Sequence, residues 1–315
     1  MRKIPALIAV LGMASVGLVG CAAGGSAATC PRPASGDSSV LDAVTIADGS
    51  GDAPDVSVYT PFKVGATEFE DVTRGTGTAI TSDEQVIVLD FTILDGTTGT
   101  TIIQTPHDGT TGVSALSAWG EQLFPTLPDA LHCATAGSRV VVGMPYTDVA
   151  ASAASQLGLK EGDSIVAVFD VADVYLPHAE GDSQFNDALG LPTVVRAPDG
   201  RPGIIVPAAT APTEVTVQTL IKGSGETVSG DSTVLLHQTS VSWDDRSVID
   251  TTWDGPAAPT DLSTLPAGVA DAVTGASVGS QLLVVVPADA TESGASASAT
   301  VYVVDVLGTG LPATQ

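Results

Sequence analysis

The chain has 315 residues, of which 43% are hydrophobic, and its 11 Lys and Arg against 36 Asp and Glu give a net charge of −25. This length suggests two domains, each large enough to bury a core. The excess negative charge disfavours nucleic acid and anionic lipid headgroups as partners, although an acidic surface is also what solubility alone requires.

The start of the chain has the pattern of an export signal. Arg2 and Lys3 are followed by an apolar stretch, residues 4–19, that is short for a membrane-spanning helix. Small residues then precede Cys21, which resembles the lipobox of bacterial lipoproteins. The resemblance implies a lipoprotein signal peptide over residues 1–20 and a diacylglycerol on the Cys21 sulfur. We therefore expect an extracytoplasmic protein, anchored by lipid alone to the outer face of the cell membrane. An ordinary signal peptide with an incidental cysteine is the alternative.

Two further cysteines, Cys30 and Cys133, remain in the mature chain. Outside the cell membrane a disulfide is permitted, and closing a loop of roughly 100 residues contributes about 4–5 kcal/mol in the chain-entropy model. We expect a Cys30–Cys133 bridge that holds the start of the mature chain to the first domain. Two free thiols are the alternative.

The first half of the chain reads as a tether followed by a β-rich domain. Residues 21–40 are rich in Ala, Gly, Ser and Pro, which predicts a flexible tether. Residues 41–178 form the first predicted domain. Its strands are expected over 43–47, 55–60, 85–94, 138–144 and 164–176, with one short helix over 127–134.

The second half repeats that order. Residues 179–212 carry five prolines and predict an extended linker, from which residues 203–208 could add an edge strand to the second domain. The second domain is predicted over 213–310 and a short tail over 311–315. Its strands are expected over 215–221, 232–243, 280–288 and 299–308, with a helix over 267–276. The shared order predicts two homologous α+β domains.

Reactive motifs are few. Residues 275–279 match GxSxG, but there a helix precedes a strand, which reverses the context that a nucleophile elbow needs. The Gly-x-Gly pairs at 75–77 and 223–225 lead into strands and predict turns, not a nucleotide site. The histidines are scattered, so we expect no metal and no cofactor; they are His107, His132, His178 and His237.

The order of motifs in both halves resembles the FKBP type of peptidyl-prolyl cis–trans isomerase. In the second half GSG is followed by VSGDSTVLLHQTS, VIDTTW, LPAGVADAVTGASVGS and ATVYVVDVL. In the first half RGTG is followed by DEQVIVLDFT, IIQT, LFPTLPDALHCATAGSR and IVAVFDVADV. The resemblance implies a curved antiparallel sheet, a half-barrel, wrapped around one short helix in each domain. A lipid anchor with two such units is familiar among actinobacterial members.

The resemblance also implies a reaction that needs no nucleophile. Rotation about an X–Pro bond has a barrier of roughly 18–20 kcal/mol, because it breaks amide resonance. A dry apolar pocket with a hydrogen-bond donor favours the twisted amide. We expect a monomer that assists the folding of exported proteins by isomerising proline-containing segments of unfolded chains. A non-catalytic FKBP-like binding or chaperone module is the alternative, and a cell-envelope spacer is a third.

The family's pocket positions fall on eleven residues, most of which depart from the family's aromatics. The expected catalytic set in the second domain is Gln238, Ile249, Asp250, Leu265, Val269 and Val303. The expected peptide-binding set in the first domain is Phe91, Ile103, Phe124, Leu127 and Phe169. Only Asp250 and Phe169 keep the family's residue type, and Tyr146 and Trp253 are candidates to replace missing rings. An ordinary core role is the alternative for each.

Overall fold

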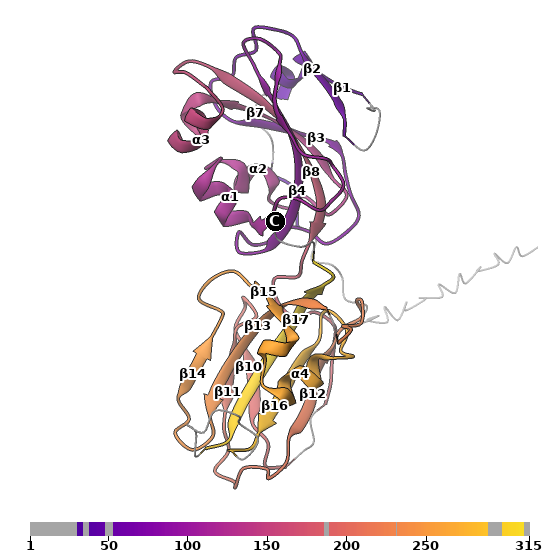
Figure 1. The fold of residues 1–315 in the computed structure, drawn as a ribbon, viewed down its shortest axis with the longest axis vertical. Coiled ribbons are helices and arrows are strands. Elements are labelled where there is room, and N and C mark those ends of the chain that lie inside the picture. Colours follow the sequence, from indigo (N-terminus) through magenta and orange to yellow (C-terminus); the bar gives the residue numbers. More distant parts are fainter. Residues whose placement is uncertain are drawn as a thin grey trace, which may run out of the picture.

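The computed structural model describes residues 30–33, 38–47, 53–185, 189–230, 232–288 and 298–311. Two antiparallel sheets, each accompanied by short helices, lie one beyond the other along the longest axis of the molecule (Figure 1). This arrangement confirms the α+β class. None of the helices in these ranges is long and apolar enough to cross a membrane. The expected signal peptide and Cys21 lie outside the described residues.

Domain 1 is a six-stranded sheet of order β3-β7-β8-β4-β5, with β6 paired to β4. Helices α1 and α2 pack on one face, and a small β1–β2 hairpin packs on the other. Three short α-helices are present where the sequence predicted one. The elements are η1 (Ser38–Ala43), β1 (Val44–Ala47), β2 (Asp55–Val58), β3 (Glu68–Thr73), β4 (Val86–Asp95), β5 (Thr101–Gln104), β6 (Val113–Ala115), α1 (Leu116–Gln122), α2 (Leu127–Leu131), β7 (Arg139–Pro145), η2 (Tyr146–Asp148), α3 (Ala151–Gln156) and β8 (Ser164–Val174).

Domain 2 has the strand order β14-β13-β17-β16-β12-β9, with β15 paired to β13. Helix α4 packs on one face and the β10–β11 hairpin on the other. The elements are β9 (Asp182–Ser183), β10 (Thr193–Arg196), β11 (Pro202–Ile205), β12 (Thr216–Lys222), β13 (Thr233–Ser242), β14 (Val248–Thr251), β15 (Ala258–Asp261), η3 (Leu262–Thr264), α4 (Ala267–Val273), β16 (Gln281–Val286) and β17 (Thr300–Thr309).

The Gly-x-Gly turns show how closely the two domains match. The amide of Gly75 donates to Ser138 Oγ over 2.9 Å, and the amide of Gly223 donates to Ser280 Oγ over 3.0 Å. A Cβ on Gly75 would lie 2.0 Å from a backbone oxygen, and one on Gly223 would lie 2.2 Å from the equivalent oxygen. Both first glycines are therefore required by close backbone packing, not by a bound nucleotide.

Two segments predicted to be extended or flexible are folded. Residues 179–212 do not act as an open linker, because they form β9 and a hairpin that covers the outer face of the domain 2 sheet. Residues 202–205 pair with β10 in their own two-stranded sheet and do not extend the main sheet. The predicted tether over 21–40 also has order in its described part, because residues 30–33 are held to domain 1 and η1 begins at Ser38. A proline at the first position of a strand, as in β11, is compatible with a hairpin. The number of prolines in this segment therefore did not justify predicting a linker.

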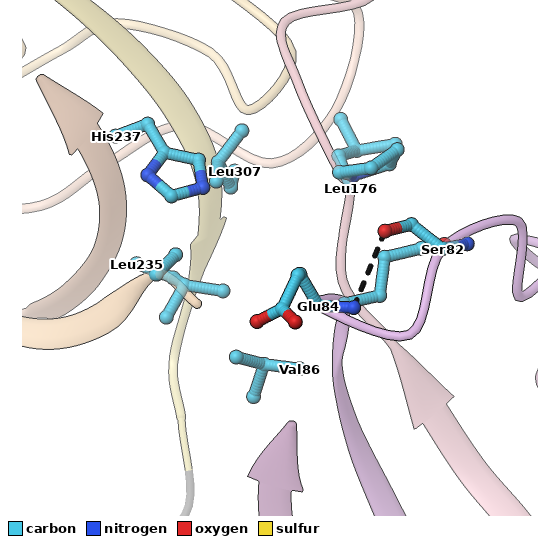
Figure 2. Close-up of a pocket in the computed structure, with 10 residues that line it drawn as sticks. Ser82, Glu84, Val86, Leu176, Leu235, His237 and Leu307 are labelled. Atoms are coloured by element: carbon cyan, nitrogen blue, oxygen red, sulfur yellow. Dashed lines mark hydrogen bonds between the residues drawn. The ribbon is translucent and has the colours of Figure 1, made fainter. Parts of the chain in front are cut away.

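The two domains meet through the ends of β8 and β17. Leu176 donates its amide to the Leu307 carbonyl over 3.3 Å, and Ala179 donates its amide to Asp305 over 2.8 Å. The buried contact includes Val86, Val88, Tyr175, Leu235, Ala257 and Leu307. Figure 2 shows Leu235 and Leu307 of domain 2 facing Val86 and Leu176 around a small cavity. Burial at this contact raises the pKa of Tyr175 to about 12.

Replacing Gly308 tests whether this contact couples the domains. A Cβ at Gly308 would lie 2.3 Å from Tyr175 Cδ1, so Gly308→Val must displace the ring. We expect Gly308→Val to lower the free energy of unfolding by about 1–3 kcal/mol, as overpacking does, and to split thermal unfolding into two transitions. Calorimetry checks this. Gly255→Val is the matched control, because a Cβ at Gly255 has nothing within 4 Å; equal effects of the two variants would contradict the assignment.

His237 gives the inter-domain region a pH dependence. It lines the cavity in Figure 2, and its ring stacks on Trp253 with centroids 4.3 Å apart. Burial, with a smaller effect of the Arg201 charge, lowers the pKa of His237 from 6.5 to about 4. Between these two values the unfolded chain binds the proton and the folded chain does not, so His237 makes stability fall as the pH falls.

We therefore expect the wild-type chain to lose more stability than His237→Asn when the pH is lowered from 7 to 4.5. Urea unfolding across this pH range measures the difference. Burial raises the pKa of Asp305, which acts in the opposite direction in both proteins and cancels in the comparison. Parallel pH profiles for the two proteins would show that His237 does not contribute.

Candidate functional site

The candidate site of domain 2 lies on the sheet face that carries α4. Alternate residues of β13 point to this face, because Val234 and Leu236 join the core beneath the helix. Gln238 and Ser240 continue this alternation. Their cross-strand neighbours share the face, which places Asp250, Ser240 and Tyr302 in one row across three strands.

Of the residues predicted for this domain, Leu265 and Val269 share one core cluster, and strand register places Gln238 and Asp250 on the same face of the sheet. Gln238 and Leu265 are half-buried, and Val269 is fully buried on α4 beneath them. Asp250 is exposed, and Ile249 on the same edge strand is 57% exposed. Val269 is therefore part of the buried floor, whereas Ile249 and Asp250 lie at the exposed edge of the sheet.

Val303 is a correction. Its side chain lies in the cluster on the opposite face of the sheet, under the β10–β11 hairpin. The residue on the helix face is Val304, which pairs with Gln238 in the same way as Phe169 pairs with Phe91 in domain 1. Since side chains alternate along a strand, the predicted alignment was wrong by one residue.

Tyr302 is a site residue that the sequence analysis missed. It packs against the core under α4, two residues before Val304 and on the same face. Burial raises the pKa of its phenol, and a hydrogen bond with the Thr300 side chain opposes this shift. The alternation with Val304 could have revealed it, had the register been placed correctly.

In domain 1 the equivalent site is filled by aromatic rings. Phe91 lies 5.6 Å from Trp119 and 6.3 Å from Phe169, and Phe124 lies 6.1 Å from Phe169, measured between ring centroids. Phe124, Phe169 and Leu127 are buried, whereas Ile103 on the edge strand is 43% exposed. Trp119 comes from α1, a helix that the sequence analysis did not predict. The core role that was left open for these residues is the one seen here.

The two sites differ in the size of their floors. Phe91, Phe169 and Leu127 of domain 1 correspond to Gln238, Val304 and Val269 of domain 2, by strand register and helix position. The smaller side chains in domain 2 occupy less of the space beside α4. The site of domain 2 is therefore the better candidate for a ligand.

Two polar features of the domain 2 site bear on what it could bind. The amide oxygen of Gln238 is buried and has no hydrogen-bond donor among the described residues. Leaving a buried acceptor unpaired costs about 1–3 kcal/mol, which a ligand N–H would recover. Pro266 stands before α4 and has no N–H, so the backbone offers no donor at that position. Hydroxyl and amide groups on the same face of the sheet come from Gln238, Ser240 and Tyr302.

The candidate replacement rings lie in different places. Tyr146 packs against the domain 1 core. Trp253 stacks on His237, which alternates to the outer face of the sheet, so it does not line the α4 side. Trp253 therefore does not replace a ring of the predicted pocket.

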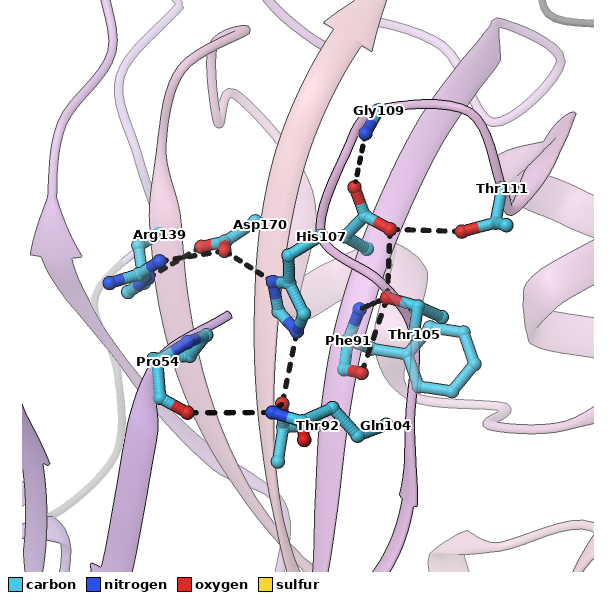
Figure 3. A network of polar contacts seen from close by, with 11 residues as sticks. Pro54, Phe91, Thr92, Gln104, Thr105, His107, Gly109, Thr111, Arg139 and Asp170 are labelled. Carbon is cyan, nitrogen blue, oxygen red and sulfur yellow. Dashed lines mark hydrogen bonds and ion pairs between the residues drawn. The ribbon is translucent and has the colours of Figure 1, made fainter. Parts of the chain in front are cut away.

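A second polar cluster in domain 1 has the geometry of a catalytic triad (Figure 3). His107 Nδ1 lies 2.7 Å from Asp170, and its Nε2 lies 3.0 Å from Thr92 Oγ1. However, Thr92 is 1% exposed and His107 is 8% exposed, so a substrate has no access to the hydroxyl. Arg139 also forms two hydrogen bonds to Asp170. The cluster is a buried polar network that holds the β5–β6 loop on the sheet.

Cys30 and Cys133 form a disulfide, with their Cα atoms 5.3 Å apart. His132 lies beside it, and one ligand atom from each of these three residues falls within 4.8 Å of the others. The sulfurs are joined to each other, which removes the thiolates that a metal would need.

No family model matches the chain, and no curated protein matches it. Solved structures of proteins with FKBP domains match the chain in fold. The three FKBP domains of wheat FKBP73 match with 14% identity and a TM-score of 0.31, covering 80% of this chain and 98% of that one. FkpA from Escherichia coli matches with 16% identity and a TM-score of 0.29, covering 40% and 54%. A putative peptidyl-prolyl isomerase, FKBP12 from Mycobacterium tuberculosis, matches with 24% identity and a TM-score of 0.27, covering 37% and 93%.

Proposed function

We propose that the protein is an FKBP-like peptidyl-prolyl cis–trans isomerase whose peptide site lies in domain 2. The observation that carries the proposal is the small, apolar floor of that site beside polar groups at its edge. Val269 and Val304 are the buried floor, the half-buried Leu265 and Tyr302 pack against them, and Gln238 lies beside Val304 on the same face of the sheet. Proline-containing segments of unfolded exported polypeptides are the proposed substrates.

Isomerisation in such a site requires desolvation and one well-placed donor. Rotation moves the amide away from its resonance form, so an apolar floor that excludes water favours the twisted state over the planar one. A hydrogen bond from Tyr302 or Gln238 to the substrate would add to this effect if it strengthened as the bond twisted. No covalent intermediate, metal or cofactor enters this mechanism.

A non-catalytic peptide-binding module is the second candidate, and Pro266 favours it. This residue removes a backbone donor at the start of α4, directly beside the floor. The same apolar site would then hold a peptide without preferring its twisted state, which gives binding without acceleration.

Variants of the full chain in a protease-coupled isomerase assay separate the candidates. We expect Tyr302→Phe to lower kcat/KM by roughly three- to tenfold, the loss of about one hydrogen bond. Phe91→Leu, a change in the filled site of domain 1 at the position of Gln238, should leave kcat/KM unchanged. Wild-type turnover equal to that of buffer would exclude the enzyme, and slower aggregation of an unfolded client without turnover would support the binding module.

Lipid anchoring at Cys21 is part of the same proposal, because it would place the protein where exported chains fold. We expect Cys21→Ser to move the expressed protein from the membrane fraction to the soluble fraction, since it removes the sulfur that carries the lipid. Fractionation with an antibody against domain 2 measures this. An unchanged membrane fraction would contradict lipid anchoring at this residue.

A further inference from the structure

Domain 1 binds its own N-terminal segment in a groove between β3 and the end of α2. Arg32 Nη1 donates to the carbonyl oxygens of Ala130 over 2.9 Å and of His132 over 2.6 Å. The guanidinium also pairs with Asp71 at 2.6 Å and lies 5.1 Å from the ring centroid of Phe69. This is a recognition site for an arginine in an extended segment, secured by the neighbouring disulfide.

The same groove exists in domain 2, and register identifies its residues. The amide of Cys133 donates to the carbonyl oxygen of Ile80 over 2.8 Å, and the amide of Gly275 donates to the carbonyl oxygen of Val228 over 2.9 Å. Gly275 therefore stands in domain 2 where Cys133 stands in domain 1. Both residues have positive φ, 62° and 84°. Pairing of β3 with β7 and of β12 with β16 places Val217 at the position of Phe69 and Thr219 at the position of Asp71.

In domain 2 no described segment fills this groove. A cavity of about 460 Å³ lies there. Val217 is 42% exposed, whereas Phe69 is half-buried under Arg32. The residues of its lining that matter here are Val217, Thr219, Lys222, Ala272, Thr274 and Gly275.

The helix-end carbonyls that bind Arg32 in domain 1 have free counterparts in domain 2. The oxygens of Ala272 and Thr274 occupy the positions of Ala130 and His132, and no donor in the described part of the chain contacts them. Carbonyl groups at the end of a helix attract cations and guanidinium donors. Lys222 at the margin does not exclude such a ligand, because Arg74 stands at the same position in domain 1 and coexists there with Arg32.

We propose that the domain 2 groove is a docking site for an extended peptide segment of another protein that carries an arginine. Gly275 offers no sulfur and Thr219 no carboxylate, so the segment binds reversibly through carbonyl acceptors and the apolar wall. The net charge of −25 increases the encounter rate of a basic segment. An acidic segment is disfavoured, because its carboxylates would face carbonyl oxygens. This site is separate from the isomerase site beside Tyr302.

A peptide that copies residues 29–34, with serine for cysteine, provides the probe. Its binding to the full chain is measured by calorimetry at low ionic strength. Thr219→Asp restores the carboxylate found in domain 1 and should tighten binding by about fivefold, the upper range for a partly exposed ion pair. Thr219→Lys should weaken it by at least the same factor. Thr219 is exposed, so both variants should fold.

Two controls make the result specific. A peptide with glutamine for arginine keeps both prolines and should lose most of the binding, which excludes capture by the isomerase site. Ser247→Lys adds the same positive charge as Thr219→Lys, but at an exposed position outside the groove. It should leave the affinity for the arginine peptide unchanged. The proposal is overturned if the two Thr219 variants bind as the wild type does, or if the arginine and glutamine peptides bind equally.

Discussion

Both faces of each sheet must be covered, and this constraint shapes the whole molecule. Short helices shield one face, and a two-stranded hairpin that precedes the long strands shields the other. The central strands are therefore buried along nearly their entire length, and β16 has no exposed residue. The hairpins cover much of the outer faces, although in domain 2 a cavity of about 270 Å³ remains between β10 and the sheet.

The repeat unit is consequently larger than the helix-and-sheet motif. Hairpin, sheet and helix recur in the same order, and backbone hydrogen bonds match across the two copies from the Gly-x-Gly turn to the end of the helix. Side chains diverged on this common backbone at two places. The helix-side floor is aromatic in domain 1 and aliphatic in domain 2, and the groove beside the helix end is occupied in domain 1 and open in domain 2.

The sequence predicted those features that depend on local patterns. Long apolar runs marked β4, β8, β13 and β17, and the Gly-x-Gly pairs marked turns, as the structure confirms. It did not predict the β10–β11 hairpin, because prolines there suggested a linker and the apolar partners lie far along the chain. It misplaced Val303 because Val303 and Val304 are adjacent and both buried, and the polar residues of β17, such as Asp305, are buried too, so the pattern did not separate the two faces. Trp119 was missed because α1 has no side-chain cap and only two turns.

The two domains differ in how firmly their side chains and their neighbouring segments are held. Domain 1 combines a filled aromatic core with an N-terminal segment held by the Cys30–Cys133 disulfide and by Arg32, and both features fix its structure. Domain 2 lacks both: Val269 and Val304 at its floor are fully buried but smaller than the rings of domain 1, and no described segment occupies the groove at its helix end. The contact around Tyr175 and Gly308 packs domain 2 against domain 1, so the more constrained domain supports the domain with the open groove.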